Sequence, residues 1–231
     1  MPTKSALVQG NISFLKGPDG SCEIWSGRNK TRIYCGVNGP GDIQASKRIF
    51  NRMNILYDFH RLPSPLDKIS ITKSTNSPST SSISDSFICS VLEDAIDSSA
   101  YPRTCLHVST QEIKVDGAIN SVTLNGLCLA LLDSGIKLRH VFCSITVAKI
   151  AEQFVIEPNS LELSSAESIF TFVFKPSLTT GGTLIASDSA GQFSLDKLVS
   201  ASELAEKEAL GIFDFYRTQI YQKFGHSLKT A

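Results

Sequence analysis

The stretch from Val115 to Gly135 constrains the fold of this chain more than any other. A turn with the sequence Val-Asp-Gly-Ala opens it, and a mostly apolar run leads from there to Gly135. A glycine-containing turn before such a run predicts a helix, with Gly135 as its stop signal. Free N–H groups at the start of a helix bind anions, and enzymes reinforce them with hydroxyl and guanidinium donors. A phosphate site would fit here, but the reinforcing positions hold Ala118, Ile119 and Asn120.

Composition places the chain among globular proteins. It has 231 residues, of which 42% are hydrophobic and 19% charged, so a full core needs no metal or disulfide. The formal net charge is zero, which argues against the global basic field of a stand-alone nucleic-acid binder. The six cysteines include no C-x-x-C pair, so we expect no zinc site and interpret most of them as small core residues.

The sequence also bears on location. Residues 1–5 begin no apolar signal segment, and no window approaches the roughly 18 consecutive apolar residues of a membrane span. We therefore expect a reducing, intracellular location and no membrane partner.

Two stretches near the N-terminus, 6–15 and 22–37, alternate between apolar and polar residues. The turn signal Gly-Pro-Asp-Gly lies between them at 17–20, so they predict an opening β-hairpin. A Ser- and Thr-rich stretch at 73–86 predicts a flexible loop. A helix is expected after it, because apolar residues recur at helical spacing before Pro102. These residues are Ile88, Val91, Leu92, Ala95 and Ile96.

The later elements suggest β-α-β units. Strands are expected at about 104–115 and from Val141 to Val147, on either side of the apolar helix. A Gly-containing turn at 179–182 predicts a second hairpin. Two helices are expected to close the chain, and Ser200-x-x-Glu203 has the spacing of a capping box at the start of the last one.

These elements predict an α/β (α+β) fold with two β-α-β type halves and two C-terminal helices. The halves are expected at 6–147 and 154–225, with a seam near 148–153. No repeat of fixed period is visible in the sequence itself.

The turn before the apolar helix resembles the ribonuclease PH family. In that family a strand ends in Asp-Gly-Gly-Thr-Arg-Thr-Ala-Ser-Ile-Thr-Gly before such a helix, and the residues from Val115 to Gly126 align with it without a gap. Asp116 and Gly117 keep the turn. The early motif Asp-Gly-Ser at 19–21 and the Gly-Pro pair at 39–40 also match. The resemblance implies a single ribonuclease-PH-like domain over 1–231.

The same resemblance implies that three catalytic elements are replaced. The Thr-Arg pair that holds inorganic phosphate becomes Ile119-Asn120, and a neutral amide does not replace a bidentate guanidinium. Family enzymes carry an Arg-Ser-Leu-Arg pattern that binds RNA, and in the alignment Ser90 and Glu93 stand in place of its two arginines. The paired aspartates of the acid or metal site fall on Leu163 and Ile169. We therefore expect no catalytic residue and no cofactor.

Two sets of charged residues each allow two interpretations. Glu157, Glu162 and Glu167 form an acidic stretch that could bind a metal through a shifted pair, although solvated charge is the ordinary interpretation. Basic residues gather outside the predicted helices, and contact with RNA competes there with a role in solubility or subunit contacts. They are Lys47, Arg48 and Arg52.

With all three elements replaced, the chain resembles the inactive ring subunits of the eukaryotic RNA exosome. This implies a structural role in RNA processing and degradation, including rRNA processing and mRNA turnover, in nucleus, nucleolus and cytoplasm. The implied partners are other ribonuclease-PH-like subunits, S1/KH-type cap subunits, a separate hydrolytic exoribonuclease and RNA passing through the ring. Two rivals remain: an active phosphate- or metal-dependent 3′ exoribonuclease acting as a homo-oligomer, and a subunit that binds RNA directly and selects substrates.

Overall fold

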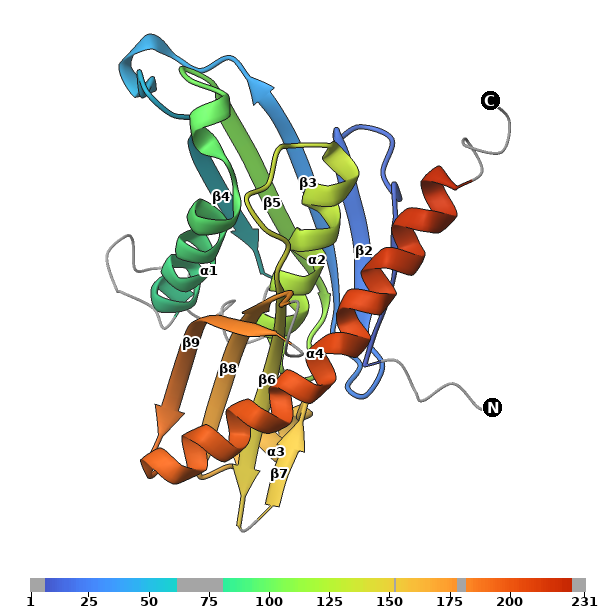
Figure 1. Ribbon diagram of the computed structural model, residues 1–231, viewed down its shortest axis with the longest axis vertical. Coiled ribbons are helices and arrows are strands. Elements are labelled where there is room, and N and C mark those ends of the chain that lie inside the picture. The colour runs from blue at the N-terminus through green and yellow to red at the C-terminus, as the bar shows by residue number, and fades with distance from the viewer. Residues whose placement is uncertain (1–6, 62–80, 152, 178–181, 226–231) are drawn as a thin grey trace, which may run out of the picture.

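A computed structural model describes residues 7–61, 81–151, 153–177 and 182–225, which form two β-sheets with helices packed against them (Figure 1). The first sheet has the order β1-β2-β3-β5-β4 and is antiparallel except for the parallel pair β4–β5. The second sheet, β7-β6-β8-β9, is antiparallel throughout.

The strands of the first sheet are β1 (Val8–Ile12), β2 (Gly20–Ser26), β3 (Arg32–Gly41), β4 (Asn54–His60) and β5 (Cys105–Lys114). Those of the second are β6 (Cys143–Ile150), β7 (Gln153–Ile156), β8 (Ser168–Lys175) and β9 (Thr183–Gly191). The α-helices are α1 (Ser81–Ala95), α2 (Ile119–Ser134), α3 (Ser160–Ser164) and α4 (Leu195–Phe224). Two short 3₁₀ turns cover Ala45–Lys47 and Ser98–Ala100.

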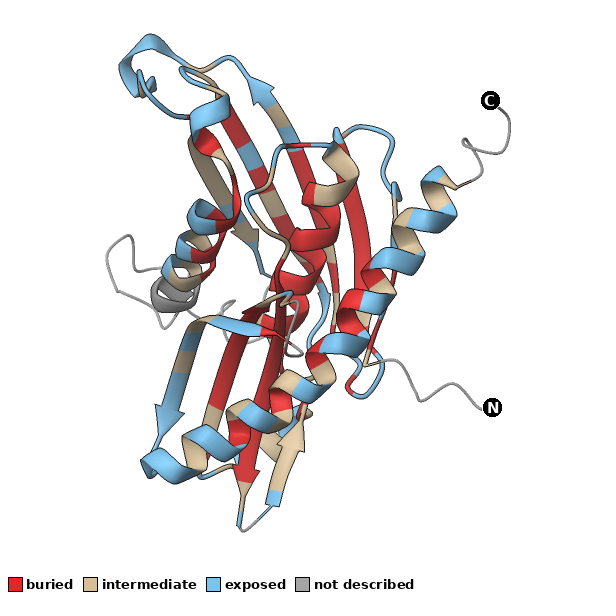
Figure 2. Cartoon of the chain, in the orientation of Figure 1, coloured by how far each residue is buried: buried red, intermediate tan, exposed pale blue. Residues whose placement is uncertain are grey.

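The apolar helix α2 forms the centre of the molecule, as Figure 2 shows by its burial. It packs on β2 and β3 of the first sheet and on β6 of the second. Every residue from Ser121 to Leu131 is therefore buried, which suits a mostly apolar helix. Gly126 allows the close approach, since a Cβ there would lie 2.7 Å from the side chains of Cys35 and Ile24. The helix ends at Gly135 in a left-handed conformation, as predicted.

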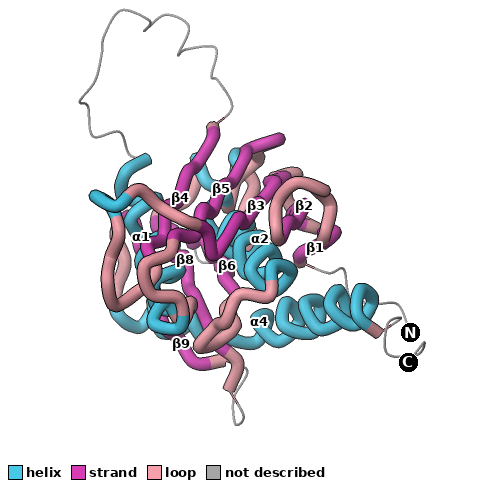
Figure 3. Tube along the Cα trace, turned by 90° about the horizontal axis from the view of Figure 1, so that it is seen from above, coloured by secondary structure: helices cyan, strands magenta, loops and turns pink. Residues whose placement is uncertain are grey.

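The C-terminal helix corrects one prediction. Instead of two helices, the single 30-residue α4 crosses the second sheet and continues along β1. Seen from above, its last turns extend past β1 (Figure 3). The Ser200-x-x-Glu203 motif caps nothing, because the Ser200 hydroxyl donates to the Asp196 carbonyl one turn earlier inside the helix. No helix in the described part of the chain is long and apolar enough to cross a membrane.

The boundary between the two sheets also differs from the prediction. β6, assigned above to the first half 6–147, pairs with β7 and β8 in the second sheet, so the seam lies before Cys143 rather than at 148–153. The stretch 22–37 contains parts of two strands, β2 and β3, not one. Of the loop expected at 73–86, residues 81–86 already belong to α1, and the rest lies outside the described residues.

Other predictions are confirmed. β1 and β2 form the opening hairpin, and β8 and β9 form the second one. The expected apolar stripe of α1 is buried. Five of the six cysteines are buried core residues, and burial raises the pKa of the Cys35 and Cys128 thiols.

Candidate functional site

A cavity of about 320 Å³ lies where the turn between β5 and α2 meets the second sheet. The turn and the start of α2 form one side, and α3, β6 and β8 form the others. Its lining residues are Val115, Gly117, Ala118, Ile119, Asn120, Thr146, Ser160, Leu163, Ile169 and Thr171.

Four of the six positions aligned with family catalytic residues line this one cavity. Ile119 and Asn120 come from α2, Leu163 from α3 and Ile169 from β8. The fold thus brings the positions on α2 together with those on α3 and β8, which lie more than forty residues later in the sequence. The side chains present are apolar or neutral, and none of the described residues that line the cavity is a lysine, arginine or histidine.

The turn between β5 and α2 is fixed by its contacts with the loop that connects β7 to α3. Gly117 has a φ of 102°, and a Cβ there would lie 2.4 Å from the Pro158 carbonyl oxygen. Only glycine suits both conditions. Thr31 fastens the turn from β3's side, because its hydroxyl donates to the Gly117 carbonyl at 2.5 Å and accepts from the Asp116 N–H at 3.0 Å. Ala118 precedes α2 in a left-handed conformation and gives no side-chain cap.

Asp116 places negative charge beside the cavity. Its Oδ1 accepts a hydrogen bond of 2.8 Å from the Ser160 hydroxyl, and its Oδ2 accepts one of 3.4 Å from the Lys30 N–H. The bond from Ser160 lowers the pKa of the Asp116 carboxyl, so this side chain is a carboxylate at neutral pH. A carboxylate next to a cavity without a lining cation disfavours phosphate.

Sequence reasoning missed the polar residues at the back of the cavity. Thr146 on β6 and Thr171 on β8 are direct partners in the antiparallel pairing, and their hydroxyl oxygens lie 3.3 Å apart. Their signal is only a threonine at matching positions of two strands, which becomes visible once the register is known.

The three glutamates take separate structural roles. Glu162 completes a capping box with Asn159 and pairs with Arg28 at 3.2 Å, while Glu167 pairs with Lys149. Glu157 is 1% exposed, and its Oε1 accepts from the Thr146 N–H at 3.1 Å. The interpretation of this acidic stretch as solvated charge is therefore wrong for Glu157. Burial raises the pKa of this carboxyl to about 7.

Neither of the remaining two catalytic positions lies in the cavity. Ser90 and Glu93 are exposed on α1, and the Ser90 hydroxyl donates to the Ser86 carbonyl of its own helix. No group of three or more His, Cys, Asp or Glu side chains that could hold a metal occurs among the residues described.

The basic residues singled out in the sequence lie in the loop between β3 and β4. Lys47, Arg48 and Arg52 are all exposed, but Arg48 is paired with Asp42 at 2.6 Å. Phe50 in the same loop is 76% exposed, and the Arg103 guanidinium lies 5.5 Å from its ring centroid. The loop thus presents an aromatic face among cations, a combination that suits stacking on a base.

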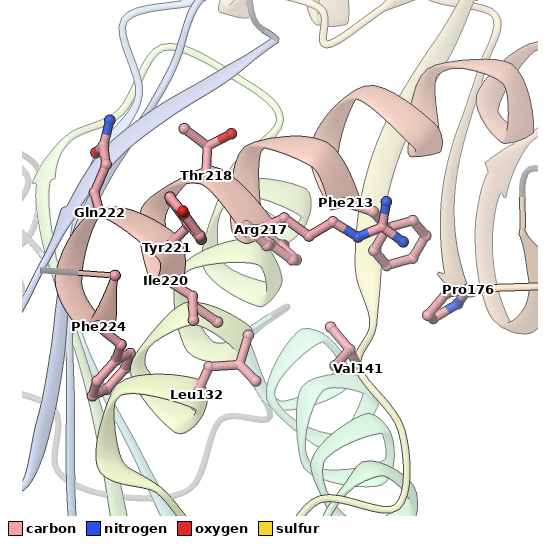
Figure 4. A pocket seen from close by; sticks show the side chains of 12 residues that line it. Leu132, Val141, Pro176, Phe213, Arg217, Thr218, Ile220, Tyr221, Gln222 and Phe224 are labelled. Carbon is pink, nitrogen blue, oxygen red and sulfur yellow. The ribbon is translucent and has the colours of Figure 1, made fainter. Parts of the chain in front are cut away.

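A larger hollow lies elsewhere in the described structure. It is a groove of about 1020 Å³ in which the last turns of α4 face α2 and the start of β6. Figure 4 shows Ile220 and Phe224 on one side and Leu132 and Val141 on the other. Arg217 is the one charged residue among those that line it, so the groove suits apolar contacts rather than phosphate chemistry.

Comparison with known proteins agrees with this geometry. Residues 8–137 match the 3′ exoribonuclease family, domain 1, and residues 140–208 match domain 2 of the same family. The two matched regions meet where the first sheet with its helices gives way to the second.

Three relatives illustrate the similarity. An exosome complex component RRP46 homolog of Caenorhabditis elegans is 28% identical, with 92% of each chain covered. The exosome complex component rrp46 of Schizosaccharomyces pombe is 29% identical over 94% of this chain and 90% of its own length. The crystal structure of rice (Oryza sativa) Rrp46 shares the fold, with a TM-score of 0.79 at 20% identity over 94% of this chain and 96% of that one.

Proposed function

This chain belongs to the 3′ exoribonuclease family, and we propose that it is a non-catalytic structural subunit of an exosome core ring. The relatives named as Rrp46 components support the assignment, because each is covered over nearly its whole length. The role would be to support 3′-to-5′ RNA processing and degradation, including rRNA processing and mRNA turnover.

One observation carries the non-catalytic part of the proposal. The cavity that the sequence resemblance aligns with the family's phosphate and acid sites is lined by Ile119, Asn120, Leu163 and Ile169 and by no described cation. Phosphorolysis requires charge stabilisation of the incoming phosphate, and none of the described residues that line the cavity supplies a positive charge for it.

The partners follow from the ring assignment. They are other ribonuclease-PH-like subunits, S1/KH-type cap subunits, a separate hydrolytic exoribonuclease and the RNA that passes through the ring. The proposed locations are the nucleus, including the nucleolus, and the cytoplasm. The exposed apolar side chains along α4 support membership of an assembly, since stable interfaces bury more than about 1,000 Å².

We further propose that the β3–β4 loop contacts RNA through Lys47 and Arg52, with Phe50 as a stacking surface. Arg48 contributes less, because Asp42 offsets its charge. In the assembled ring, Arg52→Glu should weaken RNA binding and reduce its salt dependence. Arg217→Glu on α4 serves as the matched control, since it makes the same charge change far along the chain from this loop. Equal loss in both variants would contradict a specific role for the loop.

A phosphorolysis assay tests the absence of catalysis. The purified chain is incubated with single-stranded RNA, magnesium and phosphate, and release of nucleoside diphosphates is measured. We expect none from the native chain, and co-purification of other ribonuclease-PH-like subunits from cells. A variant with Asn120→Arg, Leu163→Asp and Ile169→Asp tests whether the family's guanidinium and carboxylate groups, once introduced here, give phosphorolytic activity.

A matched control identifies contaminating nucleases. Asn120→Asp adds a second carboxylate to the cavity and should abolish any activity that the cavity supports. Phosphate-dependent release by the native chain that disappears in Asn120→Asp would overturn the proposal and favour the active homo-oligomeric exoribonuclease. Release that persists equally in Asn120→Asp belongs to another enzyme.

A further inference from the structure

The back of the cavity holds a hydrogen-bond donor that the described chain does not use. Thr146 and Thr171 are 3% and 5% exposed, and their hydroxyls bond only to one another among the described residues. Each hydroxyl carries one proton, and the bond between them uses one of the two. The second O–H is left without an acceptor, which is unfavourable for a buried donor.

A neutral amide lies at the front of the same cavity. Asn120 is half-buried, and no hydrogen bond of its side chain occurs within the described part of the protein. An amide offers both a donor and an acceptor, so it can pair with a ring nitrogen and an adjacent amino or carbonyl group. The cavity therefore presents uncharged hydrogen-bonding groups at two sides.

The other residues that line the cavity favour a ligand with an apolar surface and no negative charge. Val115, Ile119, Leu163 and Ile169 supply alkyl surface, and no lining residue among those described carries positive charge. Asp116 lies beside the cavity as a carboxylate. Since the family keeps this aspartate, the lack of a cation among the described lining residues is what disfavours a phosphate group here.

We propose that the cavity binds an uncharged heteroaromatic molecule, namely a nucleoside or its free base. Its volume of about 320 Å³ is enough for a small ligand of this kind. The flat faces of the ring contact the alkyl walls, and its edge accepts the free threonine proton and pairs with Asn120. The cavity of the family's phosphate site thus takes a ligand that lacks the phosphate. This inference rests on the cavity alone and does not require membership of a ring.

Isothermal titration calorimetry of the full chain tests the proposal. The probes are adenosine and uridine, their 5′-monophosphates, and inorganic phosphate. At least one nucleoside should bind saturably. Its monophosphate should bind with an affinity that is lower by about tenfold or more, and inorganic phosphate should not bind. A monophosphate that binds as tightly as its nucleoside, or the absence of saturable binding by both nucleosides, would overturn the proposal.

Variants place the binding in the cavity. Asn120→Ala and Thr146→Val should each weaken nucleoside binding by about fivefold to tenfold, since each removes a hydrogen-bonding group. Asn38→Ala on the exposed part of β3 and Thr218→Val on α4 are matched controls and should leave binding unchanged. Unchanged affinity in both cavity variants would refute the site. Asn120 is half-exposed, so Asn120→Ala decides the question if Thr146→Val fails to fold.

Discussion

Replacing Glu157 with glutamine should remove a pH-dependent loss of stability. Burial favours the protonated form of this carboxyl and raises its pKa to about 7 from the ordinary 4.5. Between these two values the folded state holds a proton that the unfolded state has released. The free energy of unfolding therefore falls as the pH rises from 4.5 through 7 and levels off above it.

The size of the effect follows from the two pKa values. A difference of 2.5 units, from 4.5 to about 7, corresponds to about 3 kcal/mol of stability lost at high pH. Glutamine keeps an oxygen that can accept from the Thr146 N–H but does not titrate. The native chain should therefore lose about 3 kcal/mol relative to Glu157→Gln between pH 4.5 and pH 8.

Urea unfolding followed by circular dichroism at several pH values measures this difference. The comparison with Glu157→Gln cancels the titration of all other groups. Glu203→Gln, at an exposed position on α4, is the matched control and should run parallel to the native chain at every pH. A difference between the native chain and Glu157→Gln that stays constant from pH 4.5 to pH 8 would refute the reasoning.

Two further predictions concern stability and are measured by the same unfolding experiment. Asn125→Ala should cost about 3 kcal/mol, because it leaves the N–H and C=O of Ser144 without their partner and removes the nearer of the two acceptors of the Tyr216 hydroxyl, whereas Tyr216→Phe removes only that hydroxyl and should cost about 1 kcal/mol; equal costs would contradict this account. Gly117→Ala should destabilise by about 2–3 kcal/mol through its positive φ and the contact with Pro158. Gly211→Ala, in open space on α4, should instead stabilise by about 0.5–1 kcal/mol, and a loss there would argue against the glycine reasoning.

Patterns that depend on neighbouring residues were sufficient to predict several elements. The helix after Asp116 could be predicted because α2 is mostly apolar and is followed by Gly135, and both hairpins could be predicted from their turns. The same local reasoning failed at Ser200, where a Ser-x-x-Glu spacing imitates a cap inside a continuous helix. β4 escaped notice because it is a half-buried strand at the edge of its sheet, without a clear alternation of buried and exposed residues.

Features that depend on distant partners could not be read in this way. Glu157 looks like one more charge on an acidic stretch, and its burial arises from contacts with β6 and with Asn29 across the seam. The pairing of the Thr146 and Thr171 hydroxyls depends on the register of two strands, and the two residues are 25 positions apart along the chain. Alignment to a family proposed Leu163 and Ile169 as site positions, but only the folded chain shows what else surrounds them.

In the proposed non-catalytic subunit, the cavity would persist without the family's catalytic groups because its frame also joins the two halves of the molecule. Gly117 packs against Pro158, Asp116 accepts from Ser160, and Asn29 donates to the carbonyls that precede α3. Side chains that point into the cavity, such as Ile119 and Asn120, make none of these contacts. They could change without loss of the fold, whereas the turn and its partners could not. The proposed loss of phosphate chemistry is therefore compatible with a preserved site geometry, and the preserved space is available for the proposed ligand.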